Sequence, residues 1–400
     1  MTIDELLEQM RDPLGAPFYP EVLRALLILT WVLHIFFVTV ALGSGIYTVY
    51  GYARKGEHRL RLARTTARLT PNAVGLGIVT GIAPLLFIQT IYDPIWYASN
   101  TLTGFWSVMF IFVVMGGYSL AYLFYMKGSE DGRLLWSAVV SVLLISFAGW
   151  IMHVLAAVQL RPQEWMRWYA PNGIIDTRGV VFHDFNLPRL AFILPLGGLL
   201  GIAVMMMLYA WYAAKSDADG ADAEYLGWVA ENGRRLGAVI APMYAVAGVL
   251  WAFTQGGDYD MGTEVGVSLA VLGLGLTMYF GTLRNPAQHA RRSLLIWFAA
   301  LVVVATIREL IRSRALEQFG YRVADYPYAV DWGTVILFTT TTVVGTSILT
   351  YLALVLYEAG VGDGQVSRRV NRFGRFATGM LGAWFGFFLL LGLYTAIVLN

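Results

Sequence analysis

The sequence predicts an all-α, polytopic membrane protein with about ten transmembrane helices. Apolar residues make up 58% of the 400 residues, charged residues make up only 14%, and the mean hydropathy is +0.61. Globular domains usually carry about 25% charged residues, so a soluble fold would have too little polar surface. Runs of about 20 apolar residues, each long enough to cross a hydrocarbon core about 30 Å thick, recur along the whole chain.

Each apolar run predicts one span, and most runs end at turn-forming residues such as Asn285-Pro286. The predicted spans, in order, are 22–50, 72–92, 103–126, 134–160, 189–214, 235–255, 263–283, 292–311, 332–357 and 376–399.

Lysine and arginine predict the orientation of these spans. The loops after the first, third, fifth, seventh and ninth spans carry 18 of the 28 lysines and arginines. Because cytoplasmic loops are enriched in these residues, both termini are predicted on the outer side of a bacterial plasma membrane. The cations on the outer side cluster in the segment 161–189 and at the end of the eighth span. A negative group near those two places would explain the clusters, and ordinary interfacial arginine is the alternative.

Two segments outside the spans, and one missing residue type, also bear on function. The stretch RPQEWMRWYAPNG, within 161–188, is typical of a segment at headgroup level, with a docking or quinone-entry surface as the alternative. The amino-terminal DELLEQM predicts an amphipathic helix that lies on the membrane or on a partner.

Cysteine is absent, which excludes disulfides, cysteine-held iron–sulfur clusters and c-type haem attachment. Nothing in the sequence points to a nucleic-acid partner.

His34 and His153 lie inside predicted spans, where a polar side chain needs a partner. At 1.5 Å per residue, His34 lies about 15 Å and His153 about 12 Å from the outer end of its helix. Two histidines at one depth on different helices suit the axial ligation of a b-type haem iron. A hydrogen bond to a neighbouring carbonyl is the alternative for each.

Arginines and a carboxylate near the same level complete the candidate site. Arg161, Arg308 and Arg312 lie at the outer surface and could pair with haem propionates. Glu309 and Arg312 share a helix face. Glu309 is therefore either the salt-bridge partner of Arg308 or Arg312, a haem ligand or a proton-relay group. Glycines such as Gly43 and Gly81 would let either a flat macrocycle or another helix approach. His183, in the outer-loop sequence VVFHDFNLPR, is a further candidate for cofactor binding.

Several of these motifs resemble those of cytochrome bd ubiquinol oxidase subunit I, collinearly over residues 22–315. The first span carries that family's Thr four residues before a haem-ligating His, followed by Phe-Val and Leu-Gly. Further similarities lie in the second, fourth, fifth and eighth spans. The matching residues are Thr30, His34, Phe37, Val38, Leu42, Gly43, Val79 to Ile82, Trp150, Gln159, Ala210 to Tyr212, Glu309 and Arg312.

The departures from the family are equally informative. The third span has none of the carboxylates of the family's oxygen-reducing site, and the family's fifth-helix haem histidine falls on Phe192. The long quinol-binding loop is reduced to GGDYDMGT, and a tenth span is added. The resemblance therefore implies a divergent relative that keeps at least one haem pocket and has lost the oxygen chemistry. The most economical arrangement is a single haem, with His34 paired with His153 or with Glu309.

The resemblance also implies an architecture of two four-helix bundles with two peripheral helices. The expected divisions are an outer segment 1–21, a first bundle with the haem pocket 22–160, an interfacial loop 161–188, a second bundle 189–315 and the peripheral helices 316–400.

The leading functional prediction is a b-type cytochrome subunit of a respiratory complex, a quinol-linked oxidoreductase component. It would carry haem b and pass electrons between the quinone pool and a periplasmic partner such as a multihaem cytochrome c. Two alternatives stay open. One is a terminal quinol oxidase subunit, and the other is a haem-free membrane anchor or a proton or anion transporter.

Overall fold

The computed structural model describes residues 2–216, 222–255, 262–361 and 365–398. Within these residues ten helical segments are long and apolar enough to cross a membrane, which confirms the predicted multi-pass, all-α class. The loop GGDYDMGT lies, except for its last two residues, outside the described part. The long helices are α2 (Pro20–Arg54), α3 (Glu57–Ile91), α5 (Gly104–Lys127), α6 (Leu135–Val158), α9 (Gly197–Ser216), α10 (Ala223–Phe253), α11 (Gly262–Thr282), α12 (Ala290–Glu317), α13 (Trp332–Val361) and α14 (Arg368–Val398).

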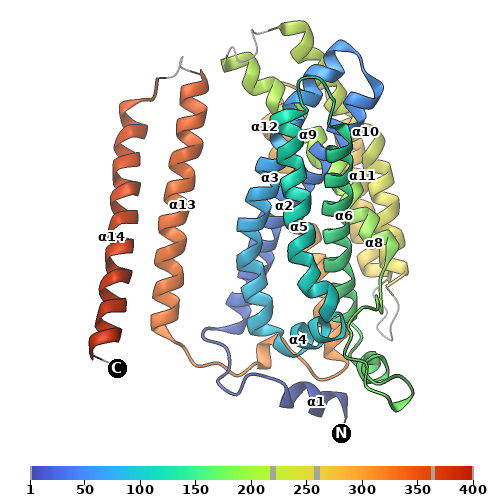
Figure 1. Cartoon of the computed structure of the whole chain (residues 1–400). Helices are drawn as coiled ribbons and strands as arrows, with labels where there is room; N and C mark the ends of the chain where they lie inside the picture. Colours follow the sequence, from blue (N-terminus) through green and yellow to red (C-terminus); the bar gives the residue numbers. More distant parts are fainter. Residues whose placement is uncertain (1, 217–221, 256–261, 362–364, 399–400) are drawn as a thin grey trace.

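The first eight spans form two adjoining four-helix groups (Figure 1). In the first group α2 packs on α3 and α6, while α5 packs on α3 and α6. In the second group α10 packs on α9 and α11, and α12 packs on α9 and α11. Helix α2 joins the groups through its contacts with α9 and α12. These neighbours match the predicted pair of bundles.

Glycine lets α2 and α9 approach closely at the seam between the bundles. A Cβ atom built on Gly43 would lie 2.0 Å from the carbonyl oxygen of Gly198 on α9. No side chain fits at that distance, so the backbones themselves are in contact there. Of the two roles left open for Gly43, the structure shows the approach of another helix.

Two helices begin well before the predicted membrane spans. α3 begins at Glu57 and α10 at Ala223, whereas the hydropathy pattern places the spans at 72 and 235. The added turns are polar, and Arg61 of α3 forms an ion pair with Asp222 at the start of α10 (3.1 Å). Hydropathy finds the apolar part of a helix, whereas backbone hydrogen bonds continue into the charged turns.

The fifth span is not one regular helix. It begins with α8 (Leu187–Ala191), continues through the π-helical turn η3 (Phe192–Leu196) and ends as α9. Pro195 lies inside the turn and has no N–H to donate, which accounts for the break in the α-helical pattern. The turn sets the direction of α8, which carries Arg189.

Short segments cover one end of the bundle, here called the termini end because both chain termini lie there (Figure 1). They include α1 (Ile3–Gln9), α4 (Asp93–Leu102) and α7 (Trp165–Tyr169). The predicted amino-terminal helix docks on the chain itself, with Leu7 buried and the Arg11 guanidinium 4.5 Å from the centre of the Tyr321 ring. Trp165 is also buried, and its indole N–H donates to the Val158 carbonyl oxygen (2.9 Å).

Helices α13 and α14 form a hairpin beside the bundles (Figure 1). In the most apolar 18-residue stretch of α13 only 6% of the residues are buried, and in that of α14 none is buried. The hairpin therefore confirms the two predicted peripheral helices. The end of the molecule where α13 ends and α14 begins is called the far end below.

Candidate functional site

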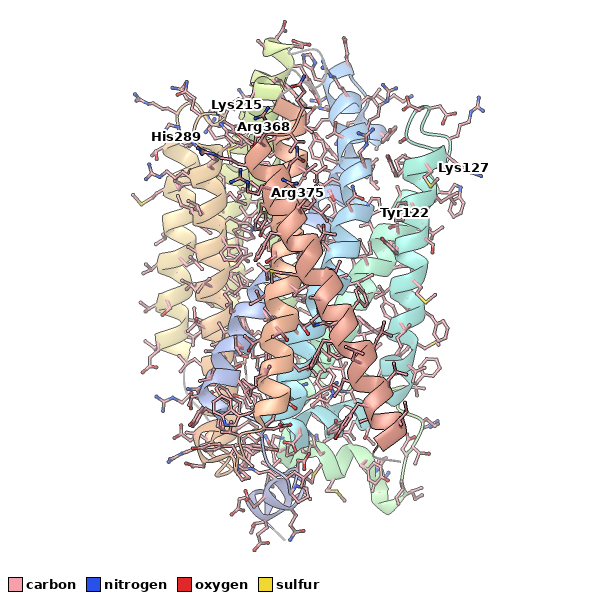
Figure 2. All side chains as sticks on the ribbon, turned by 90° about the vertical axis from the view of Figure 1, so that its left-hand side faces the viewer. Tyr122, Lys127, Lys215, His289, Arg368 and Arg375 are labelled. Atoms are coloured by element: carbon pink, nitrogen blue, oxygen red, sulfur yellow. The ribbon has the colours of Figure 1, made fainter. Side chains whose placement is uncertain are left out.

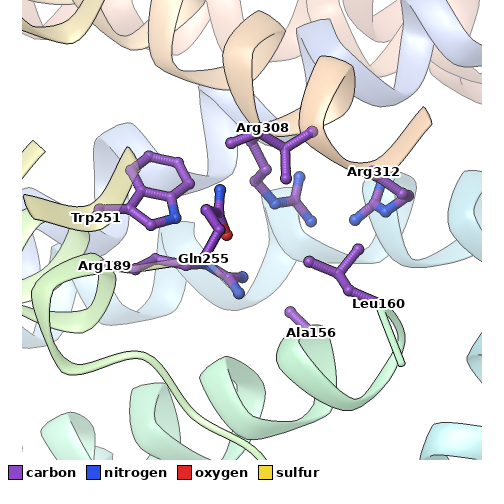
Figure 3. A pocket seen from close by; sticks show the side chains of 8 residues that line it. Ala156, Leu160, Arg189, Trp251, Gln255, Arg308 and Arg312 are labelled. Carbon is purple, nitrogen blue, oxygen red and sulfur yellow. The ribbon is translucent and has the colours of Figure 1, made fainter. Parts of the chain in front are cut away.

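A small cavity near the termini end is lined by three arginines from two helices (Figure 3). Arg189 comes from α8, and Arg308 and Arg312 come from α12. The cavity volume is about 10 Å³, about the space that one water molecule occupies. The remaining lining residues are Ala156, Leu160, Trp251, Gln255 and Ile311.

The two arginines of α12 differ in their charge partners at this cavity. Arg312 is paired with Glu309, with 2.7 Å between Nη1 and Oε2. Arg308 instead lies over the Trp31 ring, 4.6 Å from its centre, and no carboxylate of the described residues is within 4 Å of it. Because uncompensated charge in an apolar environment is costly, this arrangement favours an anionic ligand.

Two neutral groups in the cavity are also donors. The indole N–H of Trp251 and the side-chain amide nitrogen of Gln255 are buried and have no acceptor among the described residues. Buried donors normally find a partner, because an unsatisfied one costs about 1–3 kcal/mol. A ligand rich in acceptor oxygens would satisfy both donors.

His34 lies against the glycine-rich face of α3. Its Nδ1 atom is 2.8 Å from the carbonyl oxygen of Gly77, and a Cβ atom on Gly81 would lie 2.9 Å from the same nitrogen. The carbonyl can only accept, so Nδ1 carries the proton and the lone pair is on Nε2. This is the usual arrangement of a metal-ligating histidine, whose second nitrogen donates to a carbonyl or carboxylate. The ring is half-buried.

His153 is bound differently. Its Nε2 atom accepts a hydrogen bond from the backbone N–H of Asn186 (2.9 Å), and its ring stacks on Trp150. Asn186 caps α8 by accepting from the N–H of Arg189 with its side chain. In the described structure His153 thus supports the start of the helix that carries Arg189.

A different arginine lies near each of the two histidines. Arg308 interacts electrostatically with His34, and Arg189 interacts with His153. Arg308 also interacts with Arg189 and with Arg312. No hydrogen bond or ring contact joins the two imidazoles within the described residues, and neither His34 nor His153 lines the arginine cavity.

Glu309 belongs to a buried network. Its Oε1 atom accepts from the Tyr92 hydroxyl (2.5 Å), while Oε2 accepts from Arg312. The Arg312 guanidinium also lies 5.0 Å from the centre of the Tyr92 ring. Of the roles left open for Glu309, the structure shows the salt-bridge partner of Arg312.

Arg161 and His183 lie outside the cavity wall. Arg161 forms an ion pair with Asp184 (3.2 Å) and donates to the backbone oxygen of Gln255 (3.1 Å), so it touches the cavity through that residue. His183 stacks on Trp168, with ring centres 5.1 Å apart. Burial lowers the pKa of His183 below its ordinary value of 6.5.

Sequence reasoning missed three residues that line the cavity: Arg189, Trp251 and Gln255. A usable signal was present only for Arg189, which is a single cation at the start of an otherwise apolar span. Trp251 lies in the last turn of α10, and Gln255 follows that helix. Nothing in the local sequence places either residue beside α8.

Aromatic residues fill the fifth-helix position where the resembled family has a haem histidine. Phe192 is fully buried and stacks on Tyr244, with ring centres 3.9 Å apart. A Cβ atom on Gly248 would lie 2.9 Å from the Phe192 ring. In the described structure these aromatic side chains fill the position that the histidine has in the resembled family.

The described part of the chain contains no site where side chains alone could bind a metal ion. No group of three or more His, Cys, Asp or Glu side chains there could hold a metal ion. A haem iron needs only axial ligands, because the macrocycle supplies four nitrogens. The arrangement of His34 fits such a ligand, and the arginines fit the carboxylates of a haem.

Comparison with known proteins gives one structural match. No family model and no curated sequence matches the chain. The fold is similar to that of a chain in the structure of bd oxidase from Geobacillus thermodenitrificans, with a TM-score of 0.56 and 15% sequence identity. The match covers 90% of this chain and 99% of that chain. The predicted resemblance to bd oxidase is therefore confirmed for the fold.

Proposed function

We propose that this chain is a b-type cytochrome subunit of a respiratory redox complex in the bacterial inner membrane. It passes electrons between membrane quinol or quinone and an electron-carrying partner on the outer side, such as a multihaem cytochrome c. The shared fold with bd oxidase supports this class of function. The enzyme activity, a quinol-linked oxidoreduction, belongs to the assembled complex.

The geometry of His34 is the observation that carries the proposal. Its Nδ1–H is held by the Gly77 carbonyl, which fixes the ring orientation and leaves Nε2 as the ligating atom. His34, Trp31 and Arg308 are each half-buried and adjacent, so a planar group can reach the imidazole from outside the bundle. A bound haem supplies one-electron redox chemistry, which protein side chains lack.

Two residues of the chain could supply a second ligand to the haem iron. His153 is proposed first, and Glu309 is the alternative. Each would exchange a present hydrogen bond for the iron, from Asn186 in one case and from Tyr92 in the other. For His153 the exchange would free the Asn186 N–H and so would affect the start of α8.

The arginines would hold the carboxylates of the group. Arg308 and Arg312 project from one helix and Arg189 from another, so they can bind two propionates from two directions. Charge-assisted hydrogen bonds of this kind orient a planar ligand as well as neutralise it. The donors of Trp251 and Gln255 can bind the remaining acceptor oxygens. Arg161 supports the wall, and His183 is proposed to stabilise the loop beside it.

Replacement of His34 tests the assignment. The chain is purified with its native partners, and reduced-minus-oxidised spectra are recorded for wild type, His34→Ala and His34→Gly. We expect the α band of haem b to be lost or shifted in both variants. Added imidazole should restore it in His34→Gly, because the free base can occupy the space of the side chain.

The matched control is His289→Ala. His289 lies near the far end, and its Nδ1 contacts only the local carbonyl of Asn285 (3.2 Å). Its replacement should leave the band unchanged. A band unaltered in His34→Ala would remove His34 as a ligand, provided that the variant elutes as a monodisperse complex.

A further inference from the structure

The hairpin of α13 and α14 contacts the bundles at few places. At the far end Tyr357 of α13 stacks on Trp211 of α9, with ring centres 6.4 Å apart, and the Tyr212 hydroxyl donates to the Leu356 carbonyl (3.1 Å). Nearer the termini end Phe338 packs on Phe87. Such sparse contacts leave most of the apolar surface of the hairpin for lipid.

Two cations from different helices meet at the far-end contact. The ammonium nitrogen of Lys215, on α9, lies 4.8 Å from the centre of the Trp211 ring. The guanidinium of Arg291, on α12, lies 5.2 Å from the same ring. The four residues Trp211, Lys215, Arg291 and Tyr357 are called the Trp211 cluster below.

No described residue neutralises these cations. Neither Lys215 nor Arg291 forms an ion pair with a carboxylate in the part of the chain that the structure describes, and both side chains are exposed. Like charges that share one aromatic ring repel each other, and an anion between them would relieve the repulsion.

The start of α14 is rich in arginine, and Glu358 of α13, next to Tyr357, is a carboxylate beside it that accepts from the N–H and hydroxyl of Ser367. The first two turns of α14 contain four arginines and no acidic residue in the first turn. Cations near the positive end of a helix dipole are unfavourable unless an anion is nearby. Figure 2 shows Lys215, His289, Arg368 and Arg375 together at the far end of the molecule.

We propose that the Trp211 cluster binds the phosphate of an anionic phospholipid, whose acyl chains pack between α13 and the bundles. The charge complementarity, the position at the end of the spans and the apolar surface of the hairpin together favour a lipid over a soluble anion. A lipid bound in this way holds the hairpin to the bundles at their sparse contact. This site is independent of the haem proposal.

A lipid-selection experiment tests the site. The full-length protein is purified in neutral detergent and incubated with mixed micelles of phosphatidylglycerol and phosphatidylcholine in equal amounts. The lipids that remain after gel filtration are measured by mass spectrometry. With two cations at the phosphate, we expect enrichment of phosphatidylglycerol on the order of tenfold.

The test variant is Lys215→Gln with Arg291→Gln, and the matched control is Lys127→Gln with Arg133→Gln. The control removes two exposed charges at the same end but away from the hairpin. Enrichment should fall to near onefold in the test variant and persist in the control. Equal loss in both variants would assign the effect to general surface charge and overturn the site, as would the absence of enrichment in wild type.

A third measurement separates lipid binding from misfolding. Each variant must elute as a monodisperse species with the helical circular dichroism of wild type. Replacement of Tyr357 by Ala, which removes the stack on Trp211 but no charge, should reduce enrichment less than the charge variant. A larger effect of Tyr357→Ala than of the charge variant would contradict phosphate recognition.

Discussion

The two histidines inside the bundle differ in which nitrogen holds a hydrogen bond. In His34 the bond is on Nδ1 and the acceptor is a carbonyl, whereas in His153 Nε2 accepts from a backbone N–H. The first pattern leaves the exposed edge of the ring available to a metal, and the second uses that edge for structure. His34 is half-buried whereas His153 is buried, so both burial and the hydrogen-bond partner distinguish the two residues.

The network of Tyr92, Glu309 and Arg312 yields a stability prediction. Tyr92→Phe removes a hydroxyl that donates to the buried carboxylate of Glu309, which is paired with Arg312. We expect the free energy of unfolding to fall by about 1.5–3 kcal/mol, the range for hydrogen bonds to charged groups. Thermal unfolding of the purified protein measures the loss.

Tyr321→Phe is the control for this prediction. Its hydroxyl donates to a neutral group, the Ile91 carbonyl (2.8 Å), and it stacks on Tyr92. A loss of only about 0.5–1.5 kcal/mol is expected. If Tyr321→Phe lowers the free energy of unfolding as much as Tyr92→Phe does, the charge of Glu309 does not strengthen the Tyr92 hydrogen bond.

Among the elements, the loop 161–188 is held partly by the stack of His183 on Trp168. Burial lowers the pKa of His183, so the docked loop binds a proton less readily than the undocked loop. Docking is therefore complete above the ordinary pKa of 6.5 and weakens as the pH falls below it.

Limited proteolysis of the loop at different pH values measures this effect. The rate of cleavage should rise as the pH falls below 6.5 in wild type. In His183→Phe, which keeps a ring for the stack but cannot bind a proton, the rate should be independent of pH over that range. The same pH dependence in the variant would exclude His183 as its origin.

The seam between α2 and α9 gives a prediction about helix contact. Gly43→Ala places a Cβ atom against the Gly198 backbone, so the helices must separate. Overpacking of this kind typically costs about 1–3 kcal/mol in unfolding free energy. Gly275→Ala is the control, since no atom lies within 4 Å of its Cβ position, and it should be neutral or stabilising by up to about 1 kcal/mol. Equal thermal stability of the two variants would argue against a tight seam.

At the scale of the whole molecule, hydropathy was sufficient for the ten spans because each apolar run is a local property of the chain. The pair of Glu309 and Arg312 was also predictable, since residues three apart share a helix face. The contact of His34 with Gly77, 43 residues away, depends on how α2 packs on α3, and single-sequence patterns do not contain that information.

The arginine cavity illustrates the same limit. Its lining residues lie on or next to α6, α8, α10 and α12. The irregular turn that contains Pro195 directly follows α8. A cluster of outer-side cations was visible in the sequence, but which of them meet was not. Arg308 and Arg312 were identified because their helix is regular, whereas Arg189 was missed because its helix follows an irregular loop.

The proposed function requires that this chain binds haem b. The most direct measurement is the dithionite-reduced minus oxidised spectrum of the purified wild-type complex, combined with a pyridine haemochrome assay. We expect a b-type α band and at least one haem per chain. A colourless, monodisperse preparation from cells supplied with haem precursor would contradict it and would leave the haem-free anchor or transporter as the remaining function.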